Sequence, residues 1–194
     1  MINTVNEVAR IINDLGHKKD DIIIAIDGRC ASGKSTLAQE LAELFDANVF
    51  HMDDFFLRPE QRTEERLKIA GENVDHERFL EEVLLPLKSG KDFSYRPFSC
   101  SKMCLMEPTK VENKRINIVE GSYSCHKDLV EFYDLKIFLT VDVDEQMRRI
   151  VARNGETSAK VFKEKWIPLE EKYFEEFDVE NKCEYVFRWI KKSS

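Results

Sequence analysis

Short apolar runs alternate with amphipathic stretches along most of the chain. The runs are rich in isoleucine, leucine, valine and phenylalanine, which is typical of strands buried on both faces of a parallel sheet. They occupy residues 21–27, 48–52, 115–119, 135–141 and 184–189. Helical patterns occupy residues 1–16, 34–45, 60–70, 76–88, 126–133, 144–153 and 159–177. This alternation predicts a mostly parallel, three-layer α/β fold with right-handed crossovers.

The turn after the first apolar run carries a phosphate-binding motif. Residues 28–35, GRCASGKS, match GxxxxGK(S/T) between a predicted strand and a predicted helix. Glycines let backbone N–H groups turn inward around an anion, Lys34 can reach the β- and γ-phosphates, and Ser35 can bind Mg²⁺. A chance glycine turn would not need these flanks, so the motif predicts a P-loop NTPase fold that uses ATP and Mg²⁺. The expected nucleotide contacts are Gly28, Ala31, Ser32, Gly33, Lys34, Ser35 and Thr36.

One domain is expected over residues 1–194, because this length suits a single core. Residues 55–110 interrupt the strand–helix alternation, and we interpret them as an insertion on the side of the phosphoryl acceptor. Residues 148–160, which contain a polar break with a glycine, are the expected lid. The sequence allows a homo-oligomer without predicting one.

Composition limits the partners and the compartment. The formal net charge of −7 argues against nucleic-acid or anionic-membrane binding, so phosphate must meet a local positive site. Five cysteines without paired CxxC spacing favour reduced thiols over a disulfide framework or a zinc ribbon. The N-terminal residues lack the continuous apolar stretch of a signal peptide or membrane span. A cytoplasmic protein is therefore expected.

Two acidic positions follow predicted strands, at the sheet edge where open α/β folds bind ligands. Asp53 can accept the proton of an attacking hydroxyl, which favours a hydroxyl acceptor over a phosphate acceptor that Asp53 would repel. Capping a helix is the alternative for an aspartate, and we favour it for Asp54. Glu120 could bind Mg²⁺ directly or through water, or could simply be solvated at the strand end.

Several segments together resemble the uridine kinase family of P-loop nucleoside kinases. They are GRCASGKST, HMDDFF, NVDHERF, IVEGSY and VDVDEQMRRIVAR, and the match runs through most of the chain. The resemblance implies ATP-dependent phosphorylation of a nucleoside 5′-hydroxyl. Asp53 matches the family's catalytic acidic residue, and Glu120 matches its glutamate on the Mg²⁺ side.

The resemblance also implies an acceptor site. Asp75 matches an aspartate that holds ribose hydroxyls, and Tyr95 matches an aromatic residue of the nucleoside pocket. From the residues alone, Asp75 could instead cap the helix that begins at His76, and Tyr95 could belong to a hairpin core. Cys100 stands where the family usually has a base-contacting histidine, and a thiol is a weaker hydrogen-bond partner, so uridine specificity is not secured.

The predicted lid carries arginines at helical spacing. Arg149 and Arg153 share a helix face and are the candidates to meet the transferring phosphate, although a basic helix face is often only solvated. Trp166, Tyr173 and Phe174 form an aromatic stripe that we assign to packing. Cys30 lies inside the phosphate loop, where a helix N-terminus can lower a thiol pKa.

The expected function is therefore transfer of the γ-phosphoryl group of ATP to the hydroxyl of a small molecule, with uridine or a related nucleoside favoured. Nicotinamide riboside, pantothenate and sugar-like acceptors stay open, as does GTP as donor. A regulatory switch that binds ATP without an acceptor is the alternative of another class.

Overall fold

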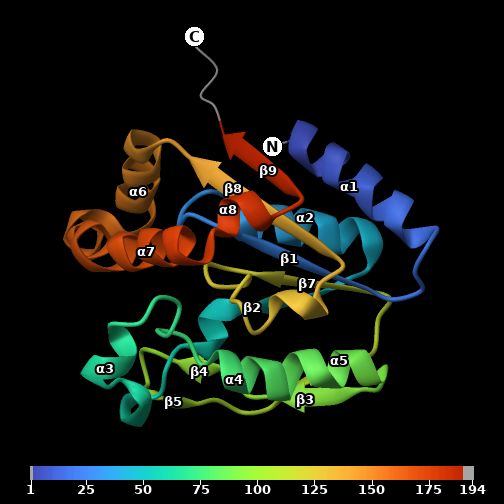
Figure 1. Cartoon of the computed structure of the whole chain (residues 1–194), viewed down its shortest axis with the longest axis horizontal. Coiled ribbons are helices and arrows are strands. Elements are labelled where there is room, and N and C mark those ends of the chain that lie inside the picture. The colour runs from blue at the N-terminus through green and yellow to red at the C-terminus, as the bar shows by residue number, and fades with distance from the viewer. Residues whose placement is uncertain (1, 190–194) are drawn as a thin grey trace.

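A five-stranded parallel sheet forms the centre of the protein, which we describe from a computed structural model covering residues 2–189. Its strands lie in the order β2–β7–β1–β8–β9, which confirms the predicted α/β sheet (Figure 1). The bounds are β1 Ile22–Gly28, β2 Asn48–His51, β7 Ile116–Glu120, β8 Leu135–Val141 and β9 Tyr185–Trp189. Each lies within about a residue of the run that predicted it.

The central strand β1 is buried on both faces, and its alternate residues feed two separate cores. Ile22, Ile24 and Ile26 pack under α1 (Ile2–Gly16) and α2 (Lys34–Phe45). Ile23 and Ala25 face the opposite core. Because β1 has no polar residue before Asp27, both faces must be covered by other elements, which is why the sheet becomes the middle of three layers.

The second core lies under two groups of helices. The first group, residues 76–89, comprises α4 (His76–Phe79), the π-helical turn η3 (Leu80–Leu84) and α5 (Leu85–Ser89). The second group consists of α7 (Ile167–Phe177) and α8 (Val179–Lys182). Phe79 from the first group and Tyr173 from the second are both fully buried. The helical segment 76–89 thus shares one core with the C-terminal helices.

Besides the helical segment 76–89, the insertion consists of loops and short hairpins, gathered below the sheet in Figure 1. Strand β3 pairs with β6, and β4 pairs with β5, both antiparallel. The predicted helix over 60–70 is wrong for most of its length, because only α3, Glu64–Leu67, is α-helical. The remaining bounds are η1 Met52–Phe55, η2 Pro59–Gln61, β3 Phe93–Tyr95, β4 Phe98–Ser99, β5 Cys104–Leu105 and β6 Thr109–Val111.

The segment after β7 also differs from the prediction. A helix over 126–133 is expected from the sequence, but only the 3₁₀ turn η4, Val130–Phe132, forms there. Helix α6, Val143–Val161, is interrupted at Gly155, whose φ of 79° is not helical, as the polar break indicated. A π-helical turn, η5 (Phe162–Trp166), then leads into α7.

Both π-helical turns stand just before a proline. Turn η3 ends two residues before Pro86, and turn η5 ends two residues before Pro168. Proline has no N–H for the regular hydrogen bond, and its ring clashes with the carbonyl four residues earlier, so a widened turn accommodates it without ending the helix. Across residues 2–189, none of the helices combines the length and apolarity that crossing a bilayer requires.

A buried carboxylate fastens the end of β1 to its surroundings. Asp27 is fully buried and accepts hydrogen bonds from the backbone N–H of Gly28 (2.6 Å) and of Cys125 (2.8 Å) and from the hydroxyl of Tyr173 (2.8 Å). Burial raises the pKa of Asp27 to about 6, and the three hydrogen bonds oppose that rise. One side chain thereby joins β1, the loop after β7, and α7.

The raised pKa of Asp27 predicts how stability varies with pH. Between the ordinary aspartate pKa of 3.8 and about 6, the folded chain holds a proton that the unfolded chain has released, so stability falls as pH rises through this window. Asp27→Asn cannot exchange that proton. Chemical denaturation from about pH 4 to about pH 7 should show wild type losing about 2–3 kcal/mol relative to the variant. Parallel stability curves would contradict this assignment.

Candidate active site

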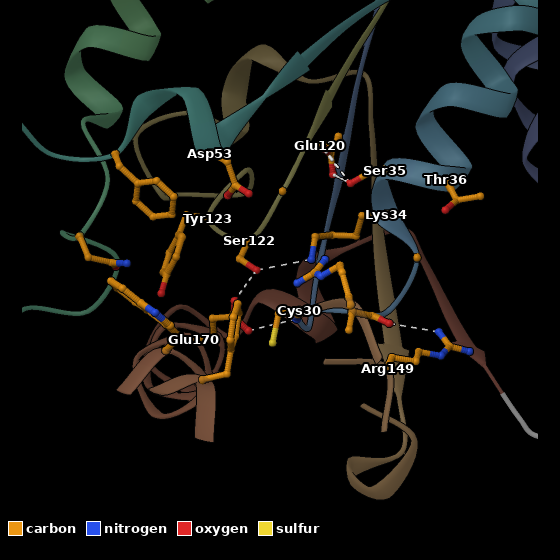
Figure 2. Close-up of a pocket in the computed structure, with 18 of the residues that line it drawn as sticks. Cys30, Lys34, Ser35, Thr36, Asp53, Glu120, Ser122, Tyr123, Arg149 and Glu170 are labelled. Atoms are coloured by element: carbon orange, nitrogen blue, oxygen red, sulfur yellow. Dashed lines mark hydrogen bonds between the residues drawn. The ribbon is translucent and has the colours of Figure 1, made fainter. Parts of the chain in front are cut away.

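A cavity of about 740 Å³ lies at the carboxyl ends of the parallel strands. The phosphate loop after β1 forms one wall, Asp53 after β2 and Glu120 at the end of β7 form another, and α6, η5 and α7 close the third (Figure 2). Open α/β sheets bind ligands at this edge, because the loops that follow neighbouring strands converge there. Residues far apart in the sequence therefore meet in one space.

The phosphate loop bends as the glycine motif requires. Gly28 has a φ of 132°, and a Cβ atom there would lie 2.0 Å from the carbonyl oxygen of Leu139 on β8, so no other residue fits. Gly33, with a φ of 102°, immediately precedes α2. Of the expected nucleotide contacts, Ala31, Gly33, Lys34, Ser35 and Thr36 line the cavity.

The Lys34 side chain is buried against the backbone of this loop. Its ammonium group donates to the carbonyl oxygens of Gly28 (2.8 Å) and Arg29 (3.0 Å) and lies 3.4 Å from the hydroxyl of Ser122. The loop backbone thus holds the cation at the cavity wall, where it is placed to meet an anion.

A second cluster stands at the start of α2. The Ser35 hydroxyl lies 3.1 Å from both carboxylate oxygens of Glu120, and the His51 Nδ1 lies 2.6 Å from one of them. The hydrogen bond to Glu120 raises the pKa of His51. Carboxylate and hydroxyl oxygens are the donors that Mg²⁺ prefers, so Ser35 and Glu120 fit the predicted metal site.

The two adjacent aspartates have different surroundings. Asp53 is open to water within the cavity, yet the protein around it desolvates the carboxyl group and raises its pKa, against the opposing effect of Lys34. Asp54 does not line the cavity; burial also raises its pKa, and it is hydrogen-bonded to Tyr95. Of these two aspartates, only Asp53 lines the cavity and can contact a ligand there.

The arginines of α6 are organised by one carboxylate. Glu145 accepts two hydrogen bonds from Arg148 (2.7 and 2.6 Å) and one from Arg149 (2.8 Å), which lower the pKa of Glu145 to about 2. Arg149 also donates to the carbonyl oxygen of Ala31 in the phosphate loop (3.1 Å). Arg149 and Arg153 line the cavity, whereas Arg148 does not.

Sequence comparison gives the same picture as the geometry. A profile of the phosphoribulokinase/uridine kinase family matches residues 23–162. The chain belongs to this family. Uridine-cytidine kinase B of Dictyostelium discoideum is 31% identical over 153 residues, which cover 73% of this chain and 62% of that protein. The chain therefore matches less than two thirds of that relative. A uridine kinase of Clostridium perfringens is 31% identical over 147 residues, covering 70% of this chain and 69% of that protein.

The fold has a solved counterpart. A possible uridine kinase from Bacillus stearothermophilus superposes with a TM-score of 0.71 at 19% identity, covering 95% of this chain and 97% of that one. At this identity the likeness concerns the fold, and it confirms the predicted P-loop architecture. The resemblance read from the sequence motifs is confirmed by the family match.

The remaining family-derived candidates lie away from the cavity walls. Asp75 is buried, caps α4 through the backbone N–H of Arg78, and lies 3.4–3.5 Å from the guanidinium groups of Arg78 and Arg58. Tyr95 is buried in the second core, where burial raises its pKa to about 12. Neither lines the cavity, so their roles toward an acceptor stay predictions. Cys100, in the place of the family histidine, does line it.

Several wall residues are absent from the sequence-based prediction. Glu170, from α7, accepts hydrogen bonds from the backbone N–H of Cys30 (3.1 Å) and from the hydroxyl of Ser122 (2.9 Å). Trp166, which the sequence analysis assigns to packing, lines the cavity as well. The remaining additions are Phe56, Asn73, Gly121, Ser122, Tyr123 and Phe162. Only the aromatic character of some of these positions could have signalled them.

The pKa of the Cys30 thiol is raised, although its position at a helix N-terminus could have lowered it. Burial raises the pKa of Cys30 to about 12, and the nearby carboxylate of Glu170 adds to the rise. The helix N-terminus does not outweigh these effects, so Cys30 is a neutral thiol and not an activated one.

Loss of the Lys34 ammonium group should remove turnover without unfolding the chain. Lys34→Ala deletes the cation that the phosphate-loop prediction places against the β- and γ-phosphates, so kcat should fall by more than about 100-fold. The matched control is Lys18→Ala, on an exposed turn after α1, which should keep wild-type kcat. Circular dichroism checks the fold. Wild-type turnover in folded Lys34→Ala protein would refute the phosphate-loop assignment.

Proposed function

We propose that this protein is a kinase that transfers the γ-phosphoryl group of ATP to the 5′-hydroxyl of uridine or a related nucleoside. The observation that carries the proposal is that one cavity contains the phosphate loop, Asp53 and residues of the insertion such as Phe56 and Cys100. A donor site alone would need only the loop. The family membership and the relatives named uridine kinase support the same reading.

The proposed chemistry assigns each group a task. The acceptor oxygen forms a bond to the γ-phosphorus, the bond from that phosphorus to the β–γ bridging oxygen breaks, and the hydroxyl proton passes to the carboxylate of Asp53. A raised pKa suits Asp53 to this role, because a base works best when its pKa approaches the working pH. Lys34, Arg149 and Arg153 would stabilise negative charge on the transferring group.

Magnesium fits the same proposal. Ser35 and Glu120 would hold the ion, with His51 fixing the orientation of the Glu120 carboxylate. The bound ion would neutralise phosphate charge and orient the γ-phosphoryl group.

An adjoining cavity supports an acceptor with a flat apolar part. It has a volume of about 490 Å³ and shares Phe56, Asn73, Cys100 and Trp166 with the larger cavity. Leu57, Leu67 and Leu169 complete much of its apolar wall. A nucleobase could pack between such surfaces while its sugar hydroxyl faces Asp53. Sugar-like acceptors and pantothenate have no comparable planar group, whereas nicotinamide riboside has one.

The base role of Asp53 is tested by its isosteric amide. Asp53→Asn keeps the shape and removes the proton acceptor, so kcat should fall by roughly 10²–10⁴ while the Kd for ATP changes only a few-fold. The adjacent Asp54→Asn is the matched control and should change kcat by less than about tenfold, because Asp54 lies off the cavity. Steady-state kinetics and nucleotide titration supply both numbers. Loss of ATP affinity with retained turnover would make Asp53 a structural or metal-side residue.

The acceptor class is tested by ADP release over uridine, cytidine, their 2′-deoxy forms, nicotinamide riboside and pantothenate. We expect ribonucleosides to stimulate release and 2′-deoxy analogues to be poorer by up to about 10⁴-fold in kcat/KM, because a site that bonds a hydroxyl rejects an analogue without it. Discrimination between bases should be weak, since Cys100 replaces an imidazole. Asp75→Asn keeps an oxygen to cap α4 and should raise the KM for ribonucleosides selectively.

The outcomes separate the alternatives. Equal activity on ribo and deoxy substrates, or activity on pantothenate with all nucleosides inert, would refute the nucleoside reading and leave the kinase. ATP hydrolysis that no acceptor stimulates would favour a regulatory switch.

A further inference from the structure

Two histidines and a glutamate form a second cluster of potential ligands, outside both cavities. Glu72 and His76 come from the insertion, and His126 comes from the loop after β7. One ligand atom from each lies within 4.8 Å of the other two. The two imidazole rings stack at 3.9 Å, and the His76 Nε2 lies 3.3 Å from both carboxylate oxygens of Glu72. The cluster therefore joins two parts of the fold.

One nitrogen of this cluster is buried without a partner. The His126 ring has no exposed surface, and its Nε2 has no hydrogen-bond partner among the residues that the structure describes. An unsatisfied buried nitrogen costs free energy unless something else binds it. Burial, with some help from the charge of His76, lowers the pKa of His126 to about 3, so protonation does not relieve it. The neutral imidazole is the form that binds metal ions.

The backbone makes room for this ring at Gly71. Gly71 has a φ of 79°, and a Cβ atom there would lie 2.8 Å from the Cδ2 of His126 and 3.1 Å from its Nε2. A glycine beside Glu72 thus lets the chain pass directly over the imidazole edge that carries the unpaired nitrogen.

A single carboxylate stands on the opposite side of both rings. The Asp128 Oδ2 lies 3.6 Å from the Nδ1 of His76 and 3.6 Å from the Nδ1 of His126. At 3.6 Å this carboxylate is too far to accept a hydrogen bond from either ring, but its negative charge favours a cation beside the two imidazoles. The backbone N–H of Asp128 donates to the Nδ1 of His126 (3.4 Å), which places the ring proton on the buried Nε2. This Nε2–H has no acceptor among the described residues, and a metal ion would displace its proton.

Other charged side chains surround the cluster of Glu72, His76 and His126. Arg66 lies 3.3 Å from the Glu72 Oε2 and 2.7 Å from Glu77, so it pairs with Oε2 of Glu72. Glu77 also lies 3.6 Å from the His76 Nε2. Lys127 rests over the ring of Phe177 and adds positive charge near His126. The negative charges of Glu72, Glu77 and Asp128 oppose these cations.

We propose that Glu72, His76 and His126 bind a divalent transition-metal ion, with Zn²⁺ as the best match, in a site separate from the nucleotide cavity. Two imidazole nitrogens and one carboxylate oxygen are a ligand set that Zn²⁺ accepts, whereas Mg²⁺ prefers oxygen alone. The ion would fasten residues 71–76, which precede and begin α4, to the loop after β7. It would act on stability and not on phosphoryl transfer.

The test titrates the metal-free full chain with Co²⁺ in the presence of excess Mg²⁺, which occupies sites made of oxygen ligands. We expect one Co²⁺ per chain with a visible d–d absorption band and no thiolate charge-transfer band, displaced by Zn²⁺. At a free Zn²⁺ concentration about 100 times Kd, Tm should rise by roughly 5–10 °C.

Three variants and one control decide the ligands. Asp128→Asn should weaken Co²⁺ binding by about 10–100-fold, and Glu72→Gln and His126→Gln by more, because they remove direct ligands. His17→Gln, at an exposed turn, should bind as wild type does. Glu72 is partly exposed and its variant should fold even if that of His126 does not. Absence of a one-to-one Co²⁺ complex in wild type, a thiolate band, or undiminished binding by Glu72→Gln would overturn the proposal.

Discussion

The phosphate loop depends on one helix that lies far from it in the sequence. Helix α7 supplies Glu171, which makes a two-point ion pair with Arg29, Glu170, which accepts from the loop backbone, and Tyr173, which donates to Asp27. The glycines of this loop leave its backbone with a wide choice of conformations, so contacts from outside the loop are needed to fix it. Three residues within one turn of α7 provide such contacts, and Arg149 of α6 adds a hydrogen bond to the carbonyl oxygen of Ala31 in the same loop.

The sequence predicts those parts of the fold whose signal is local. The sequence predicts strands β1, β7 and β8 because both of their faces are buried, which requires a nearly continuous apolar run. The structure of residues 60–70 is not predicted correctly, because the helix there stops after one turn. The Arg66 side chain instead donates hydrogen bonds to the carbonyl oxygens of Glu72 and Val74. These bonds are tertiary, so no pattern of spacing announces them. The π-helical turns before Pro86 and Pro168 were readable in principle, since the prolines stand inside helical patterns.

The candidate site likewise contains some residues that the sequence predicts and others that it does not. Lys34, Ser35, Asp53 and Glu120 could be predicted because a strand, a turn and a polar residue occur together in sequence, and each of the four lines the cavity. Glu170 could not, because its significance arises only when α7 packs over the loop, and a glutamate on a charged helix looks solvated. Recognition of the family supplied Asp75 and Tyr95, but the local environment of each is already satisfied by the protein. Motif transfer therefore names positions more reliably than it names contacts.

Charge decides what the cavity can accept. Among the described residues its wall carries three cations, Lys34, Arg149 and Arg153, and three carboxylates, Asp53, Glu120 and Glu170. The formal charges balance at neutral pH when all three carboxyl groups are ionised. A nucleoside triphosphate would therefore bring a large uncompensated negative charge into a partly desolvated space. A divalent cation beside Ser35 and Glu120 would offset part of that charge next to the phosphate loop. A chain with a net charge of −7 could thus bind a nucleoside triphosphate through a few cations around the loop, with a divalent metal ion supplying the remaining compensation.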